Sequence, residues 1–431
     1  MGGRKMKKWL VFLMITIAVT VFLVGCQAEK EETTETGPVG RTVLNVYAGQ
    51  SEEENLELLV RAYEAKNNDT VIQVHLIPDS EYTQQMMRIK NKEAEADCIF
   101  FPDAGEAAIW KNKKILKDLN SWYKGTEEAN YYAPWYEALD DKEACYYIPY
   151  RLGKLCVYYN KTLFDSLGVK YPAEGWTWEE YKEKARKLTG WSNNKKVYGT
   201  LGFESSSSWW MLPARTRGAY NPFNPQDLEL FRESAEWCHE FTSEFAEAFP
   251  YLARTGDEWS GYHKLFLEGR LGMYFGEDGE VNMINQEMKK QGLSFEYDVA
   301  ELPAWEDDDK TDVYTTAVVT MAESTKYPEE AYRFMKFCVG EEGGRLLAGN
   351  STVSAWQSPS VQNRYLTATR IPEHANYFLM DSVPAENAVG VLYNAGIEAM
   401  CNEVSMYLLA EQELNYTFEN IEKELKELKA K

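Results

Sequence analysis

The stretch VLNVYAGQSEEENLELLVRAYEAKNNDTVIQVHLI, residues 43–77, has the pattern of a strand, a helix and a second strand. Residues 43–47 form a short apolar run that ends at the breaker sequence AGQS. Residues 52–67 then carry apolar side chains at helical spacing, and residues 70–77 return to a strand pattern. This β-α-β order predicts an α/β fold.

The same alternation continues towards the C-terminus. Residues 96–101 read as a strand and 104–113 as a helix, and the chain is extended from 146 to 159. A further helix is predicted over 178–188, with Thr177 as its N-cap. At 431 residues the chain is too long for one core, so we expect two or three domain-sized units.

The N-terminus predicts export. Four of the first eight residues are Lys or Arg, and the apolar run 9–24 is short for a permanent membrane span. Its end, LVGC at 23–26, resembles the bacterial lipobox, in which the cysteine is acylated. We therefore expect 1–25 to be a lipoprotein signal peptide and Cys26 the lipidated first residue; an ordinary anchor helix is the alternative.

The residues after Cys26 predict a tether. Residues 26–41 are rich in Glu and Thr and lack apolar periodicity, so they cannot bury enough surface to fold. We expect them to form a flexible link between lipid and domain.

The formal charge of −22 disfavours two classes of partner. A protein that binds phosphate backbones or anionic lipid surfaces needs positive charge. Removing the four signal-peptide cations makes the chain still more acidic. We expect no nucleic-acid partner.

Seven cysteines are present, but none forms a Cys-x-x-Cys pair, so no metal site is predicted. Cys98 and Cys338 lie in apolar strings and read as small buried hydrophobes. Cys145 and Cys156 are the one pair close in sequence, which leaves a disulfide open; core burial is the favoured interpretation.

Motifs typical of enzymes are missing. The sequence has no phosphate-binding loop, dinucleotide fingerprint, G-x-S-x-G elbow or H-E-x-x-H helix, and its four histidines are far apart. Glu277 and Asp278 could serve as a glycosidase acid and base, but acid-rich chains contain such pairs by chance. We predict no catalysis and no cofactor.

Aromatic residues are the compositional signal for function. They make up 14% of the chain, and several lie beside polar or loop-breaking residues, such as Trp209-Trp210 after four serines. Aromatic faces suit the C–H faces of sugar rings, while planar polar groups bind the hydroxyls. Ordinary core packing is the alternative for any single aromatic.

Seven separated strings match one family in order. Besides residues 43–77 and 82–119, they are YIPY at 147–150, VYYNK at 157–161, WTWEE at 176–180, FLEGRLGMYFG at 266–276 and PEEAYRFMKF at 328–337. Together these strings resemble the extracellular solute-binding proteins of family 1, which include the maltose-binding protein. The resemblance covers nearly the whole mature chain.

The resemblance implies the two-lobe, type II periplasmic-binding-protein fold, an α/β architecture whose lobes are joined by a hinge. The solute is held in the cleft between the lobes, and the lobes close on it. By position we expect lobe 1 at 42–153 and 312–350, and lobe 2 at 154–311 and 351–431.

Ligand-binding residues follow from the strings that align. The resemblance implies a site built from Gln50, Ser51, Glu52, Phe101, Asp103, Tyr150, Arg151, Trp210, Glu277, Asp278, Tyr393 and Asn394. Two alternatives stay open, since Ser51 could cap a helix and Arg151 could form a structural salt bridge. Many relatives have a Trp where Glu277 and Asp278 stand, so hydrogen bonding replaces stacking there.

The implied function is the substrate-binding component of an ABC importer, a lipid-anchored monomer on the extracytoplasmic face of the cell membrane. It would pass a carbohydrate to permease subunits. Two other classes remain: the same fold binding a polyamine, glycerol phosphate or peptide, and a secreted glycoside hydrolase.

The lipobox resemblance generates the first prediction. Cys26→Ser removes the thiol that is acylated, so we expect the variant to remain unprocessed or to be released, while the wild type stays with the membrane fraction. Detergent partition and gel migration measure this. If the variant fractionates and migrates like the wild type, Cys26 is not the anchor.

Overall fold

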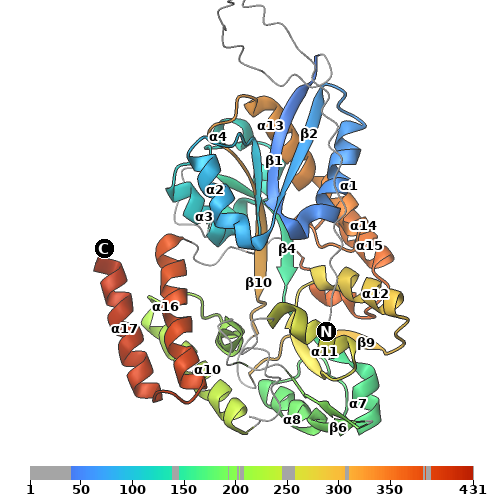
Figure 1. The fold of residues 1–431 in the computed structure, drawn as a ribbon, viewed down its shortest axis with the longest axis vertical. Coiled ribbons are helices and arrows are strands. Elements are labelled where there is room, and N and C mark those ends of the chain that lie inside the picture. The colour runs from blue at the N-terminus through green and yellow to red at the C-terminus, as the bar shows by residue number, and fades with distance from the viewer. Residues whose placement is uncertain are drawn as a thin grey trace, which may run out of the picture. The chain divides into compact units, whose positions relative to one another are not determined.

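The first sheet has five strands in the order β2-β1-β3-β10-β4. Its strands are β1 (Thr42–Gly49), β2 (Thr70–Ile77), β3 (Cys98–Phe101), β4 (Tyr147–Lys154) and β10 (Tyr314–Met321). Strand β1 pairs in parallel with β2 and β3, whereas β10 is antiparallel to β3 and β4. The predicted β-α-β order is confirmed (Figure 1).

The structure is a computed structural model, and it describes residues 40–137, 145–192, 194–200, 203, 208–244, 258–305, 310–381, 384 and 390–430. Contacts group the described residues into one unit. The predicted signal peptide and Cys26 lie outside the described residues, as does most of the tether. Within the described part, no helix has the length and apolarity needed to cross a membrane.

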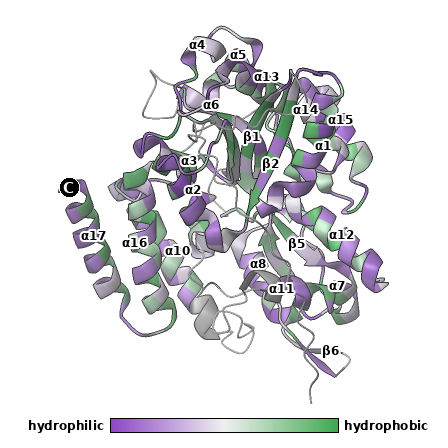
Figure 2. Ribbon diagram, turned by 45° about the horizontal axis from the view of Figure 1, so that its top comes forward, coloured by the Kyte–Doolittle hydropathy of each residue, from purple (hydrophilic) through white to green (hydrophobic). Residues whose placement is uncertain are grey.

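Helices cover the first sheet because each has one apolar stripe. On α1 the side chains of Leu56, Leu59 and Tyr63 are buried, and the Tyr63 ring meets the edge of Phe334 with centroids 5.1 Å apart. The helices here are α1 (Glu53–Glu64), α2 (Tyr82–Lys90), α3 (Ala104–Asn112), α4 (Asn120–Tyr123), α5 (Glu127–Tyr131), α6 (Ala133–Glu137), α13 (Pro328–Val339), α14 (Glu341–Gly349) and α15 (Pro359–Ala368). In Figure 2 the strands β1 and β2 are mainly hydrophobic.

The second sheet has three strands in the order β8-β5-β9. They are β5 (Cys156–Asn160), β8 (Met273–Gly276) and β9 (Tyr297–Glu301), and β5 is antiparallel to both neighbours. A small hairpin, β6 (Gly190–Ser192) and β7 (Lys195–Val197), stands apart from them. The helices on this side are α7 (Lys161–Leu167), α8 (Trp178–Leu188), α9 (Leu212–Arg215), α10 (Pro225–Glu244), α11 (Glu258–Leu267), α12 (Gly279–Gln291), α16 (Val391–Leu408) and α17 (Leu414–Ala430).

Three chain segments meet at the joint between the two sheets. Strand β4 leads into β5, and β9 returns to β10 (Figure 1). A third segment, residues 351–355, pairs with β4: the Leu152 N–H donates to the Val353 carbonyl at 3.2 Å, and the Ala355 N–H to the Tyr150 carbonyl at 3.1 Å. The first two segments are covalent links between the two sheets, whereas residues 351–355 join α14 to α15 on the side of the first sheet. We name all three the crossover segments.

Ion pairs around Lys154 hold together the ends of two crossovers that adjoin the second sheet. The Lys154 ammonium at the end of β4 lies 2.9 Å from an Asp312 oxygen and 3.3 Å from a Glu301 oxygen. Lys310 pairs with the other Glu301 oxygen at 2.9 Å. The links β4–β5 and β9–β10 are therefore held together by alternating charges.

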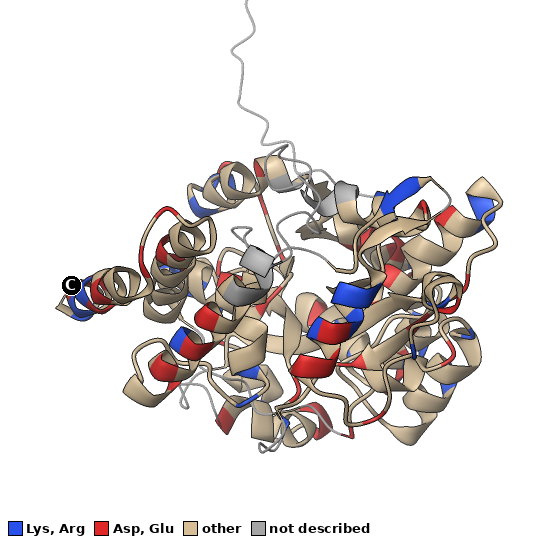
Figure 3. Cartoon of the chain, turned by 90° about the horizontal axis from the view of Figure 1, so that it is seen from below, with Lys and Arg blue, Asp and Glu red and all other residues tan. Residues whose placement is uncertain are grey.

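The described cysteines, Cys98, Cys145, Cys156, Cys238, Cys338 and Cys401, are all unpaired, and all but Cys401 are buried. The prediction of Cys98 and Cys338 as small buried residues is confirmed, and Cys145 and Cys156 form no disulfide. Figure 3 shows Asp and Glu on many helices, with Lys and Arg among them.

The start of α8 generates the second prediction. The Thr177 hydroxyl accepts from the Glu180 N–H at 3.2 Å, and a Glu180 carboxylate oxygen accepts from the Thr177 N–H at 3.0 Å, which confirms the predicted cap. We expect Thr177→Ala to lower the free energy of unfolding by about 1 kcal/mol. Thr177→Ser keeps the acceptor and is the control. Urea unfolding that shows equal losses for both variants would contradict the capping account.

Candidate functional site

Arg151, in crossover strand β4, binds a buried carboxylate. Its Nε lies 3.1 Å from a Glu52 oxygen, which also accepts from Nη2, and Glu52 is only 5% exposed. Burial disfavours the guanidinium charge, but Glu52, Tyr150 and Asp278 outweigh it and raise the pKa of Arg151. The structural salt bridge, one of the two interpretations of Arg151, is present.

Glu277, after β8, contacts two of the crossovers. Its carboxylate accepts from the Thr315 hydroxyl of β10 at 2.8 Å. It also covers Gly153 of β4, where an added Cβ would lie 2.2 Å from a Glu277 oxygen. A side chain at position 153 would therefore displace Glu277. Burial raises the pKa of Glu277 to about 7, against the lowering effect of Thr315.

Asp278 binds the third crossover. It is fully buried, and one of its oxygens accepts from the Val353 N–H at 2.6 Å. The other oxygen has no hydrogen-bond partner. Burial raises the pKa of Asp278 to about 6, although the charge of Arg151 lowers it. The second oxygen is therefore an unsatisfied acceptor inside the protein.

A network of hydrogen bonds between neutral polar groups lies next to the bond between Asp278 and Val353. The Asn55 carbonyl oxygen on α1 accepts from Asn350 at 3.3 Å and from the Thr352 hydroxyl at 3.1 Å. The Asn350 backbone carbonyl accepts in turn from Asn282 on α12. These amides join the first helix of one lobe to α12 of the other through the third crossover.

The structure brings a second set of predicted residues together, at α3 and α16. Asp103 caps α3 by accepting from the Glu106 N–H at 2.7 Å. A Cβ built at Gly105 would lie 3.0 Å both from an Asp103 oxygen and from the Asn394 amide nitrogen. Asp103 and Asn394 therefore flank Gly105, far from each other in sequence, and Tyr393 beside Asn394 is partly buried.

Two predicted aromatic residues lie within cores. Phe101 is 1% exposed at the end of β3, with its ring edge towards Tyr82. Trp210 is fully buried and packs on Phe231. Its neighbour Trp209 is only partly buried. Ligand contact by Phe101 and Trp210 stays a prediction.

The sequence analysis selected Trp210 as a ligand-binding residue, whereas the more accessible ring of the two belongs to Trp209. Its ring centroid lies 5.2 Å from Phe275, and its edge faces Tyr262. No periodicity distinguishes the two tryptophans, since they are adjacent on a short helical turn, η3 (Ser208–Met211).

The loop after β1 exposes two predicted residues. Gln50 and Ser51 are exposed, and the Gln50 amide donates to Glu53 at 3.0 Å. Neither the N-cap of η1 (Gln50–Glu52) nor that of α1 makes a side-chain capping bond. The alternative role of Ser51 as a helix cap is therefore not observed, and ligand contact by Gln50, Ser51, Glu52 and Tyr150 stays a prediction.

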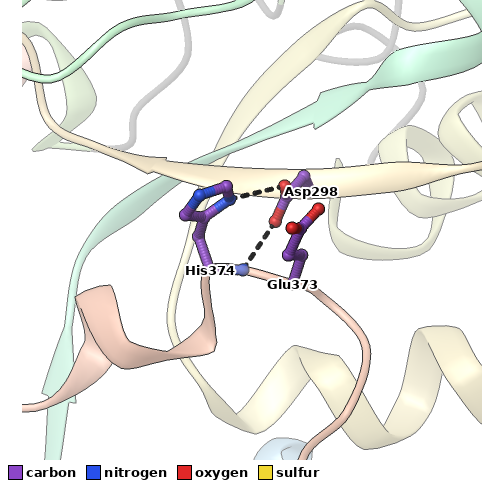
Figure 4. A group of neighbouring side chains, drawn as sticks. All are labelled: Asp298, Glu373 and His374. Atoms are coloured by element: carbon purple, nitrogen blue, oxygen red, sulfur yellow. Dashed lines mark hydrogen bonds and ion pairs between the residues drawn. The ribbon is translucent and has the colours of Figure 1, made fainter.

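One group of described side chains has metal-ligand chemistry: Asp298, Glu373 and His374, whose ligand atoms lie within 4.8 Å of one another (Figure 4). The buried Asp298 accepts from the His374 ring at 2.7 Å and from the His374 and Val299 N–H groups at 3.0 and 2.9 Å. Glu373 pairs with Lys161 at 3.7 Å. These contacts tie the loop before η5 (Ala375–Phe378) to β9, which explains why the three side chains lie together.

A cavity of about 360 Å³ adjoins this anchor. Its polar lining includes Glu174, Glu301 and Lys310, and its aromatic lining Tyr159, Trp176 and Tyr377. Glu301 and Lys310 are already paired with each other. The cavity lies beside β9, within the second lobe.

Two α/β lobes that meet at a polar hinge built around the crossover segments define a two-lobe binding protein of the periplasmic type. The chain belongs to the bacterial extracellular solute-binding protein family, whose model matches residues 49–345. A binding protein of Brucella abortus is 22% identical over 291 residues, 65% of this chain and 67% of the relative. The predicted family and fold class are confirmed.

Solved structures share the fold across the chain. A sugar transporter protein from Rhizobium etli, in an open conformation, superposes with a TM-score of 0.74 at 20% identity, covering 89% of this chain and 99% of that one. An ABC substrate-binding protein from Listeria monocytogenes in complex with cycloalternan gives 0.74 at 19% identity, covering 90% and 99%.

The Arg151–Glu52 pair generates the third prediction. Arg151→Ala leaves a buried carboxylate without its cation, so we expect a loss of about 3 to 5 kcal/mol in the free energy of unfolding. Adding Glu52→Gln to Arg151→Ala should restore part of the loss. The exposed pair Lys187–Glu183 supplies the control, and Lys187→Ala should cost under about 1 kcal/mol. Additive effects of the two hinge substitutions would show that the pair is not coupled.

Proposed function

We propose that the chain is the extracytoplasmic substrate-binding component of an ABC importer, and that it binds a carbohydrate and delivers it to a membrane permease. One observation carries this proposal. Within a family of extracellular solute-binding proteins, the chain matches nearly the full length of a sugar transporter protein and of a receptor in complex with cycloalternan.

The proposed mechanism is lobe closure. We assign residues 42–153 and 312–350 to lobe 1, and 154–311 and 351–431 to lobe 2. The solute binds between them, with Asp103 from one lobe and Asn394 from the other within reach of the same ligand. Affinity then depends on how many more contacts the ligand makes in the closed arrangement than in the open one.

The proposed location is the outer face of the cell membrane. Residues 1–25 direct export, the lipid on Cys26 holds the protein at the membrane, and 26–41 tether the lobes near the permease. The protein acts as a monomer, because one lobe pair suffices to enclose one solute.

The aromatic and amide groups favour a sugar among the possible solutes. Trp209 has a partly exposed ring, while Asp103 and Asn394 offer the planar polar groups that bind hydroxyls. We propose binding without turnover: the Glu277 and Asp278 carboxylates, the one candidate acid–base pair, are engaged by Thr315 and Val353.

The fourth prediction is that a mono- or oligosaccharide stabilises the protein by mass action. At a ligand concentration of one hundred times Kd, the gain is about 2.7 kcal/mol, seen as a rise in melting temperature. A sugar panel measured by thermal unfolding tests this. A shift with a polyamine, phosphate ester or peptide alone would replace the sugar, and release of reducing ends would indicate a hydrolase.

The same panel tests Asp103. We expect Asp103→Ala to weaken binding by about 1 to 3 kcal/mol, the cost of losing a charged hydrogen-bond partner. Asp103→Asn keeps an acceptor for the α3 cap and separates lost binding from lost folding. Unchanged affinity in Asp103→Ala would remove this residue from the site.

A further inference from the structure

Two adjacent side chains of lobe 2 reach all three crossover segments. Glu277 bonds Thr315 of β10 and covers Gly153 of β4, while Asp278 bonds the Val353 N–H of the third segment. Both residues sit at the corner where β8 ends and α12 begins. A corner that contacts both links between the sheets, and the segment beside them, is placed to control how the lobes move.

This corner has a surplus of negative charge. Three carboxylates, those of Glu52, Glu277 and Asp278, act on one guanidinium, Arg151, and Glu52 already takes two of its N–H groups. One oxygen of Asp278 is buried without a hydrogen-bond partner, although the backbone N–H groups of Asp278 and Gly279 lie close enough to lower the pKa of this carboxyl. A site of this kind favours neutral carboxyl groups, because the charges of a fully buried Asp278 and a partly buried Glu277 lie close together and share one cation.

Other titratable groups face the pair from neighbouring elements. Tyr150 of β4 and Tyr365 of α15 lie near Arg151 and Asp278 respectively. Tyr262 of α11 faces Glu277, and the Tyr158 hydroxyl of β5 donates to the Glu277 backbone carbonyl at 2.6 Å. Glu280 of α12 interacts with Glu277 but has its own partner, His263 of α11, at 2.8 Å.

We propose that Glu277 and Asp278 form a proton-sensitive clasp on the hinge, which holds the β8–α12 corner against the three crossovers when protonated and releases it when both groups are ionised. The inference rests on the lobe closure of the proposed function. It makes Glu277 and Asp278 positioning residues, because they act on a solute through the crossover segments.

The direction of the pH effect follows from the thermodynamic linkage between proton binding and conformation. Burial raises the pKa of both groups in this arrangement, to about 7 and about 6, so the arrangement binds protons more tightly than one in which the corner is hydrated. Lowering the pH through this range therefore favours the clasped arrangement. Raising it favours separation of the corner from β4, β10 and Val353.

The fifth prediction uses the ligand-free full chain. Small-angle X-ray scattering and tryptophan fluorescence between pH 5 and 8 should show a transition, with the radius of gyration rising with pH and a midpoint between about 6 and about 7. Glu277→Gln with Asp278→Asn removes both ionisable groups, so this variant should keep the low-pH values throughout. Glu287→Gln removes a carboxylate that is paired with Lys290 on the same helix; it is the matched control and should follow the wild type.

Several results would overturn the clasp. A wild type whose radius and fluorescence stay constant from pH 5 to 8 would refute it without any variant. A folded double variant that keeps the wild-type transition would assign the transition to another group. Lower melting temperatures in the single variants with an unaltered transition would show a structural role alone. Because no ligand is present, these outcomes are independent of the sugar panel.

Discussion

The buried charge of Arg151 is the constraint on which the joint between the lobes depends. A guanidinium inside a protein needs carboxylates close by, and here they come from separate parts of the chain: Glu52 bonds it directly, and Asp278 faces it from lobe 2. The ion pair fixes the loop after β1 against crossover strand β4. Consequently the first helix of lobe 1 is positioned by the same residue that lies on the path to lobe 2.

A polar joint suits segments that must move. Apolar packing around the crossovers would hold one arrangement by shape complementarity, whereas hydrogen bonds to Asn55, Thr315 and Val353 can be exchanged for bonds to water as the lobes shift. At their lobe 2 ends, two crossovers are kept together by the ion pairs of Lys154 with Asp312 and Glu301. The crossovers thus remain bundled while the corner beside them can change its contacts.

Local patterns predicted elements well, because their causes are local. The spacing of Leu56, Leu59 and Tyr63 predicts α1, and the Thr177 cap sets the start of α8 at the predicted residue. Helix α1 ends at Glu64, earlier than the predicted Asn67, and there the Asn67 side chain donates to the Tyr63 carbonyl. The roles of Glu277 and Asp278 could not be read in this way. Their partners Thr315 and Val353 are distant in sequence, and only the fold brings them together.

Two separate sets of residues link the lobes, one at the hinge and one where α3 faces α16. At the hinge, the Glu277–Asp278 corner contacts the crossovers; on the side of α3 and α16, Asn394 lies beside Gly105 and Asp103. In the proposed mode of binding, a solute between Asp103 and Asn394 would replace that arrangement with its own hydrogen bonds, so its gain would be the difference between the two sets of contacts. A ligand shifts an equilibrium only by its differential affinity for the two states. If the hinge itself favours neither the open nor the closed arrangement strongly, the difference in ligand contacts decides how much of each arrangement is populated. Burying the Glu277–Asp278 corner costs free energy, and the charge of Arg151, which the two carboxylates share, offsets part of that cost. The hinge therefore has only a small preference for one arrangement of the lobes.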